Sequence, residues 1–182
     1  MSLEKALEAA ELGGRRDQEE FFEELRIPSI STLPEHAKDV RRNADWLRQR
    51  FDRMGFRTSL TDVEGGLHPV LEAEWKGREG APLLTVYGHY DVQPPDPLEE
   101  WESPPFEPTV RDGLVYARGA ADNKGNHFAA LKAAEHWFAA GGPPVNLRYL
   151  IEGEEEISGV SLPRYIRQHA KRLATDYVLV WD

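Results

Sequence analysis

The sequence has no cysteine, and no apolar run approaches the roughly 20 residues that a membrane-spanning helix needs. The missing thiols exclude a disulfide framework, a cysteine nucleophile and a Cys-ligated zinc site. Any metal site must therefore use histidine and carboxylate ligands. The N-terminal residues show no apolar segment followed by a cleavage site, so no secretory signal is recognised. We expect a cytoplasmic protein with no membrane partner.

Positive charge is also scarce. The 182 residues contain 22 Lys and Arg against 32 Asp and Glu, which leaves a formal net charge of −10. Because a nucleic-acid-binding domain normally carries a basic footprint, no nucleic acid partner is expected. The length and the 40% hydrophobic content suit one compact domain with a real core.

The hydrophobic pattern alternates between strand-like and helix-like segments. Residues 3–25 are rich in Ala, Glu and Leu but contain Gly13-Gly14, which predicts one broken helix or two short ones. Further helices are predicted over 34–54, 123–140 and 162–173, and strands over 56–60, 69–75, 82–87, 145–151 and 177–181. A hairpin is predicted through Asp112-Gly113. Strands and helices that alternate in this way indicate an α/β layered domain.

Residues that could bind a metal or take part in catalysis follow several of these segments. His89-Tyr90-Asp91 ends the strand at 82–87, and the H-x-D spacing suits a metal-binding imidazole with a carboxylate on its other nitrogen. A purely structural His–Asp pair is the alternative. Asp122 lies at the start of a predicted helix between Gly119 and Gly125, where its alternative role is a helix N-cap.

The third and fourth candidates are acidic. Glu152-Gly153-Glu154-Glu155-Glu156 follows a buried-looking strand, where mutual repulsion needs relief from a cation or a proton, although a solvated loop is the alternative. Asp182 follows the last apolar strand and could equally be a turn residue. Together, one histidine and several carboxylates near the edges of one sheet suit paired divalent ions such as Zn²⁺.

Four sequence blocks resemble the M20 metallopeptidase family, which includes carnosinase-like dipeptidases, acetylornithine deacetylase and succinyl-diaminopimelate desuccinylase. They are Gly-His-Tyr-Asp-Val-Gln-Pro at 88–94, the Trp/Pro-Phe-Glu-Pro segment at 101–108, the segment 116–125 and the acidic segment 152–159. The resemblance extends over about residues 15–182. It implies a three-layer α/β sandwich with a mostly parallel central sheet, zinc-exopeptidase-like and incomplete at the C-terminus.

The resemblance also implies roles for individual residues. The implied metal ligands are His89, Asp122, Glu156 and Asp182, with Asp122 bridging two Zn²⁺ ions; Mn²⁺ or Co²⁺ are alternatives. Asp91 and Glu155 carry the implied catalytic roles: Asp91 orients His89, and Glu155 takes a proton from the water between the metals. Glu154 leaves an alternative register, but the Glu-Gly-x-Glu-Glu pattern favours 155 and 156. Asp122-Asn123 is implied to be a cis peptide.

The implied activity is cleavage of amide bonds in dipeptides or short peptides, with an N-acyl amino acid deacylase as the alternative. Residues 1–182 would be the N-terminal portion of the catalytic domain, without the family's lid domain, its C-terminal portion or its further histidine ligand. The remaining candidate histidines, His68, His127, His136 and His169, are expected to be surface or packing residues. A third reading is therefore a non-catalytic fragment, whereas the full-length protein is expected to form a homodimer.

Overall fold

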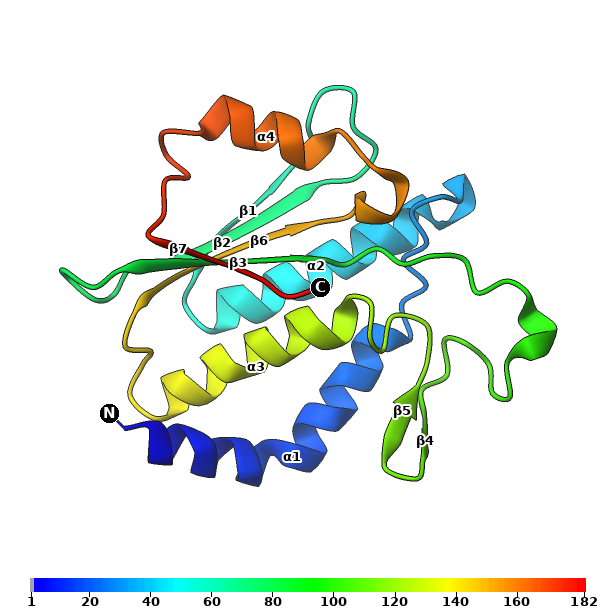
Figure 1. Cartoon of the computed structure of the whole chain (residues 1–182), viewed down its shortest axis with the longest axis horizontal. Helices are drawn as coiled ribbons and strands as arrows, with labels where there is room; N and C mark the ends of the chain where they lie inside the picture. The colour runs from blue at the N-terminus through cyan, green and yellow to red at the C-terminus, as the bar shows by residue number, and fades with distance from the viewer. Residues whose placement is uncertain (1) are drawn as a thin grey trace.

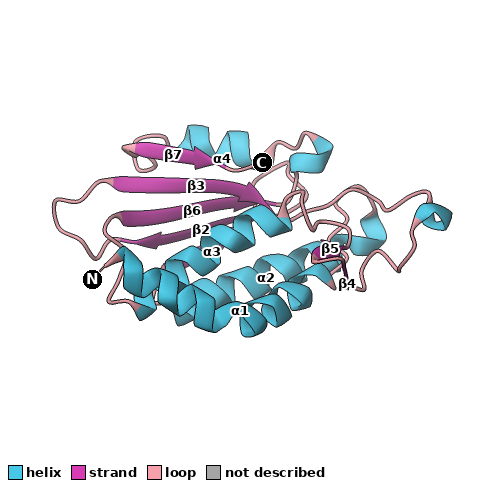
Figure 2. Cartoon of the chain, turned by 60° about the horizontal axis from the view of Figure 1, so that its bottom comes forward, coloured by secondary structure: helices cyan, strands magenta, loops and turns pink. Residues whose placement is uncertain are grey.

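The computed structural model describes residues 2–182, which are built around a five-stranded sheet. The strands, in spatial order, are β1 (Arg57–Thr61), β2 (Val70–Trp75), β6 (Asn146–Glu152), β3 (Leu83–His89) and β7 (Tyr177–Val180). Strands β6, β3 and β7 run parallel, whereas β1 and β2 form an antiparallel pair beside β6. Figure 2 shows β2 pointing against β6, β3 and β7. The sheet is therefore mixed, with its parallel part on the β3 side.

Helices cover both faces of this sheet, which confirms the three-layer arrangement (Figure 1). Helices α2 (Ala37–Arg53) and α3 (Lys124–Ala139) cover one face, and α1 (Leu3–Leu25) packs outside α3. Helix α4 (Ser161–His169) covers the other face. The remaining elements are the hairpin of β4 (Thr109–Arg111) and β5 (Leu114–Tyr116) and three short 3₁₀ turns, η1 (Pro34–His36), η2 (Leu98–Glu100) and η3 (Glu155–Ile157).

The main core lies between the sheet and helices α2 and α3. Val40, Ala44, Leu47 and Phe51 recur at helical spacing along α2 and are fully buried. They pack with apolar side chains of the central strands, including Tyr149. Burial of such a stripe supplies the main free energy that holds a helix on a sheet. The helix predicted from this pattern is confirmed.

The prediction that α1 is broken at Gly13-Gly14 is wrong, because the helix is continuous from Leu3 to Leu25. Gly13 lies where α1 meets α3. A Cβ at this position would be 2.8 Å from Cε1 of His136 and 2.6 Å from an Asp17 carboxylate oxygen. The glycine therefore permits close helix packing, which outweighs its local cost of about 1 kcal/mol.

Helix α4 ends at His169, earlier than the predicted Leu173. The guanidinium of Arg148, which is fully buried on β6, donates hydrogen bonds to the main-chain carbonyls of Arg172 and Leu173 at 3.1 and 2.9 Å. This buried cation needs those acceptors, and the chain turns to present them. The turn leads directly into β7, whose residues are all exposed at the edge of the sheet.

Candidate functional site

The candidate site lies where the parallel strands end. His89 is the last residue of β3 and is fully buried, and Asp182 follows the end of the neighbouring strand β7. Asp122 lies just before helix α3. Because parallel strands bring their carboxyl ends to one edge of a sheet, residues far apart in the sequence meet here.

Three side chains converge at this edge. Nε2 of His89 lies 3.0 Å from Oδ1 of Asp122 and 3.4 Å from Oδ1 of Asp182. One ligand atom from each of the three residues lies within 4.8 Å of the others. A carboxylate oxygen of Glu155 lies 4.0 Å from the same nitrogen. The structure thus gathers four of the six residues singled out in the sequence around one imidazole nitrogen.

The donor set fits a divalent metal ion. Nε2 of His89 is buried and makes no hydrogen bond, although two carboxylate oxygens lie within 3.4 Å of it. An orphaned imidazole nitrogen that faces two carboxylates is the arrangement that a cation would satisfy. One nitrogen and several carboxylate oxygens suit zinc and similar ions. The group of His89, Asp122 and Asp182 could therefore hold a metal ion.

Asp91 holds the other side of the His89 ring. Nδ1 of His89 lies 3.1 Å from the main-chain oxygen of Asp91 and 3.3 Å from its Oδ1, and both residues are fully buried. A proton on Nδ1 directs the lone pair of Nε2 toward the carboxylates. Burial lowers the pKa of His89, but contact with Asp91 and the charges of Asp122 and Asp182 raise it to about 9.

Glu155 and Glu156 diverge from the turn after β6. Glu155 faces His89, whereas a carboxylate oxygen of Glu156 accepts a hydrogen bond from Nε2 of Gln93 at 2.7 Å. Burial and the nearby Asp122 charge raise the pKa of Glu156. Glu156 therefore lies outside the three-residue group, on the Gln93 side.

Glu154, the alternative candidate in the acidic segment, makes a different set of contacts. It is buried, and its two carboxylate oxygens accept hydrogen bonds from the main-chain N–H groups of residues 67, 68, 160 and 161 and from the Ser161 hydroxyl. Burial raises its pKa, but these donors lower it below the ordinary value. Glu154 connects the 67–68 loop to the start of α4 and faces away from His89. Of these neighbouring glutamates, Glu155 has a carboxylate oxygen 4.0 Å from Nε2 of His89.

Asn123 is a site residue that the motif alone did not single out. Its Oδ1 accepts a hydrogen bond from the main-chain N–H of His89 at 3.3 Å. Its Nδ2 donates to the Trp181 carbonyl and to Oδ1 of Asp182, both at 2.8 Å. One amide side chain therefore joins two residues of the group. The Asp122-Asn123 peptide is cis, as the resemblance implied.

The other candidate histidines supply no atom to the three-residue group, although His127 contacts the main-chain oxygen of His89 at 2.9 Å. His127 and His136 are buried on α3, where each contacts a carboxylate of α1. His68 is buried against the Ser31 carbonyl, and the His169 ring packs on Tyr165. None of them supplies a fourth ligand atom in the part of the chain that the structure describes.

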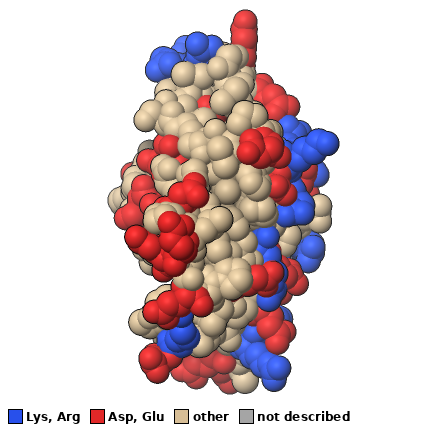
Figure 3. Space-filling model, turned by 90° about the vertical axis from the view of Figure 1, so that its right-hand side faces the viewer, with Lys and Arg blue, Asp and Glu red and all other residues tan. Residues whose placement is uncertain are grey.

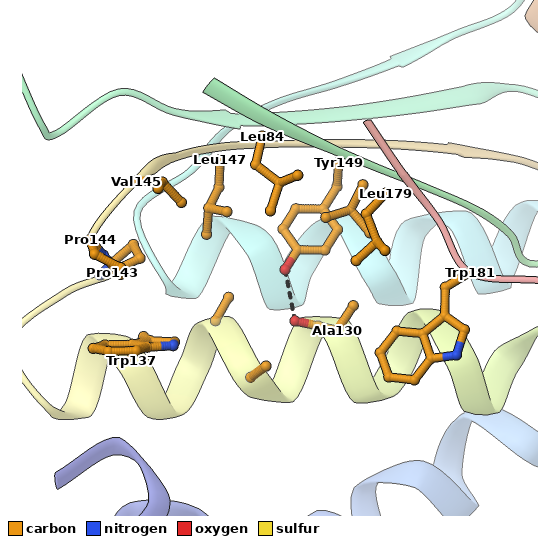
Figure 4. A pocket seen from close by; sticks show the side chains of 13 residues that line it. Leu84, Ala130, Trp137, Pro143, Pro144, Val145, Leu147, Tyr149, Leu179 and Trp181 are labelled. Atoms are coloured by element: carbon orange, nitrogen blue, oxygen red, sulfur yellow. Dashed lines mark hydrogen bonds between the residues drawn. The ribbon is translucent and has the colours of Figure 1, made fainter. Parts of the chain in front are cut away.

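A pocket of about 210 Å³ lies between β3, β6, β7 and α3, and its lining includes Trp181, the residue before Asp182 (Figure 4). Trp137 and Trp181 lie at opposite ends, and the Tyr149 hydroxyl donates a hydrogen bond to the Ala130 carbonyl at 2.7 Å. No carboxylate, imidazole or cationic side chain lines this pocket. The candidate metal-binding group at the carboxyl edge of the sheet is therefore separate from the lining of this pocket.

Acidic side chains form several groups on the face of the molecule at that end (Figure 3). A surface of this sign attracts cations. None of the described helices is long and apolar enough to cross a membrane.

The site is thus one that could hold a divalent ion at the edge of an α/β sheet. Residues 85–182 match the family described as Peptidase family M20/M25/M40, and the chain belongs to this family. A relative from Bordetella parapertussis, named succinyl-diaminopimelate desuccinylase, is 41% identical over 142 residues, which cover 75% of this chain and 36% of the relative.

Two solved structures of similar proteins have the same fold. Human carnosine dipeptidase 1 superposes with a TM-score of 0.92 at 29% identity, over 98% of this chain and 41% of that chain. An M20 family metallo-carboxypeptidase from Sulfolobus solfataricus gives 0.81 at 37% identity, over 91% of this chain and 37% of that chain. Each relative is named for a hydrolytic activity. The chain spans about two fifths of their length.

Proposed function

We propose that residues 1–182 form the N-terminal portion of the catalytic domain of a metal-dependent hydrolase that cleaves amide bonds in dipeptides or short peptides. The observation that carries this proposal is the convergence of His89, Asp122 and Asp182, with Glu155 at 4.0 Å from the same imidazole nitrogen. Similarity to human carnosine dipeptidase 1 supports the substrate class.

Two Zn²⁺ ions, or Mn²⁺ or Co²⁺ in their place, would polarise the scissile carbonyl and lower the pKa of the attacking water. His89 and Asp182 would hold one ion, Glu156 the other, and Asp122 both. Glu155 would accept the proton of the water and deliver it to the leaving amine. Asp91 would keep the His89 ring oriented, and Asn123 would hold the main chain of His89 and the carboxylate of Asp182 together.

An N-acyl amino acid deacylase is the second candidate. It is favoured by the 41% identity to the Bordetella desuccinylase, which is higher than the 29% identity to the human dipeptidase. The reaction has the same chemistry, since both substrates present an amide carbonyl to a water and a base. The two candidates differ only in the groups that flank this amide.

A substrate panel decides between them. The 182-residue chain, and any longer product of the same reading frame, are loaded with Zn²⁺, Mn²⁺ or Co²⁺ and incubated with dipeptides, N-succinyl amino acids and N-acetyl amino acids, and the released amine is quantified. Turnover of dipeptides supports the first proposal. Turnover of N-acyl amino acids alone would reject it in favour of the deacylase.

For the 182-residue species by itself we propose weak binding of the second ion and little turnover. The described residues provide one three-ligand group, and Glu156 lies outside it. The number of Zn²⁺ ions bound per 182-residue chain tests whether the second ion binds weakly. Robust hydrolysis by this chain would contradict the proposal of little turnover. A homodimer of the longer protein and a cytoplasmic location stay predictions.

A further inference from the structure

The main-chain carbonyl of His89 is held by a second histidine. Nδ1 of His127, in the first turn of α3, lies 2.9 Å from the His89 oxygen. Both residues are buried, with side chains 1% and 0% exposed. Because a carbonyl oxygen only accepts hydrogen bonds, Nδ1 of His127 is the donor in this contact.

The other ring nitrogen of His127 is also engaged. Nε2 lies 2.7 Å from Oε1 of Glu24, a fully buried residue in the last turn of α1. The same oxygen accepts a hydrogen bond from Nδ2 of Asn43 on α2 at 3.0 Å. Burial raises the pKa of Glu24, but His127, Lys124 and Asn43 lower it below its ordinary value. A charged carboxylate in this position orients the ring through a strong hydrogen bond.

The C-terminal end of α1 is also held against α3 by a second set of hydrogen bonds. Lys124, fully buried beside Asn123, donates hydrogen bonds from Nζ to the main-chain oxygens of Glu24 and Ile27 at 3.1 and 2.7 Å. Glu24 therefore has little freedom to move relative to α3. The contact chain runs from α1 through the His127 ring to the last residue of β3.

We propose that Glu24 and His127 are positioning residues for His89, acting through its main-chain carbonyl. The inference rests on the proposed function, in which His89 is a metal ligand. Asn123 holds the N–H of His89, His127 holds its carbonyl and Asp91 holds its ring. The ligand residue is thus held on three sides, and metal sites need their ligand atoms placed within about 0.2 Å.

A matched pair on the same two helices separates positioning from packing. His136 on α3 contacts Asp17 on α1, with 2.7 Å between Nε2 and Oδ2, and it is also buried. This pair has the chemistry of the Glu24–His127 pair but makes no contact with a residue of the site. Substitutions at His136 therefore report the cost of losing a buried His–carboxylate contact between α1 and α3.

The test is a Co²⁺ titration of the metal-free 182-residue chain, followed by its d–d absorption, together with thermal unfolding of the metal-free protein. In His127→Asn the side-chain amide can replace the Nδ1 donor, whereas in His127→Gln the donor lies at the Nε2 position. We expect His127→Gln to weaken Co²⁺ binding about 10- to 100-fold and to change the absorption bands. His127→Asn retains most of the affinity. His136→Gln and His136→Asn lower the unfolding temperature without changing the Co²⁺ affinity.

Two results would overturn the inference: an unchanged Co²⁺ affinity in His127→Gln, or an equal loss in His127→Asn and His127→Gln.

If His127→Gln does not fold, Glu24→Gln is compared with Asp17→Asn. The neutral amide weakens the hold on His127, so Glu24→Gln should reduce Co²⁺ affinity several-fold while Asp17→Asn does not; equal affinities would reject the inference. If the unaltered chain binds no Co²⁺, the metal site itself is rejected, and with it this inference. Binding by the unaltered chain without an effect of the variants rejects the inference alone.

Discussion

Asp91 connects His89 to the turn that carries the catalytic glutamate candidates. Its Oδ1 lies 3.3 Å from Nδ1 of His89, and its Oδ2 accepts the main-chain N–H of Glu156 at 3.1 Å. One buried carboxylate therefore sets both the ring orientation of a ligand candidate and the position of the segment after β6. This double contact explains why a short H-x-D motif can organise residues that are more than 60 positions apart.

We expect Asp91→Ala to lower the Zn²⁺ affinity of the 182-residue chain about 10- to 100-fold, because Nδ1 of His89 loses the neighbouring carboxylate and keeps only the main-chain oxygen of residue 91. Competition with a chromophoric chelator measures this change. Glu99→Ala, at an exposed position of the 3₁₀ turn η2, serves as the control and should leave the affinity unchanged. Equal affinities of Asp91→Ala and the control would contradict the role given to Asp91.

Metal binding should depend on pH through His89. Burial lowers its pKa, but Asp91, Asp122 and Asp182 raise it to about 9. Below that pH the ring of the metal-free protein is protonated, and the proton must leave before Nε2 can act as a ligand. The apparent affinity for Zn²⁺ should therefore increase between about pH 6 and pH 8, by up to about tenfold per pH unit, and level off near pH 9.

Calorimetric titration in two buffers of different ionisation enthalpy measures the proton release that accompanies this binding. The expected release is close to one proton per ion at neutral pH. A pH-independent affinity with no proton release would show that His89 is already neutral in the metal-free protein.

Glu155→Gln should remove hydrolysis and retain metal binding. Loss of a general base costs about 10²- to 10⁴-fold in kcat, whereas Glu155 is not one of the three converging ligand residues. The measurement compares kcat with Zn²⁺ stoichiometry in whichever product of the reading frame is active on the substrate panel. Full activity of Glu155→Gln would exclude it as the base.

Glu154→Gln is the matched substitution one residue earlier. It weakens hydrogen bonds to the 67–68 loop and to the start of α4, and each bond to a charged acceptor contributes about 1.5–3 kcal/mol. We expect a lower free energy of unfolding in denaturant titrations, with metal affinity changed less than stability. A stable Glu154→Gln protein that fails to bind metal would instead place Glu154 in the site.

Acid should destabilise the sheet through Glu72. Burial raises its pKa, but hydrogen bonds from Arg172 and Tyr165 lower it below the ordinary 4.5. A group whose folded pKa is depressed stabilises the protein above its unfolded pKa and loses that contribution as the pH falls through the folded value. The difference in unfolding temperature between the unaltered chain and Glu72→Gln should therefore be largest at neutral pH and shrink below about pH 4.5. A constant difference down to about pH 3 would contradict this.

Local patterns predicted most elements because they depend on neighbouring residues. The spacing of Val40, Ala44, Leu47 and Phe51 predicted α2, and Asp112-Gly113 predicted the turn between β4 and β5. Gly13-Gly14 misled the prediction for α1, since the local preference of glycine is weaker than the packing of α1 on α3. The C-terminal end of α4 was also predicted incorrectly. It depends on hydrogen bonds from Arg148, which is distant in the sequence.

The sequence by itself predicted which residues are candidates for the chemistry. The candidates stand next to predicted strands and helices, and parallel strands must bring their carboxyl ends together. They are His89, Asp91, Asp122, Glu155, Glu156 and Asp182. Only the tertiary structure decided that Glu154 supports α4, and that Asn123 and His127 hold the main chain of His89. These decisions depend on contacts between distant segments, and a linear pattern contains no information about which acceptor a buried side chain will meet.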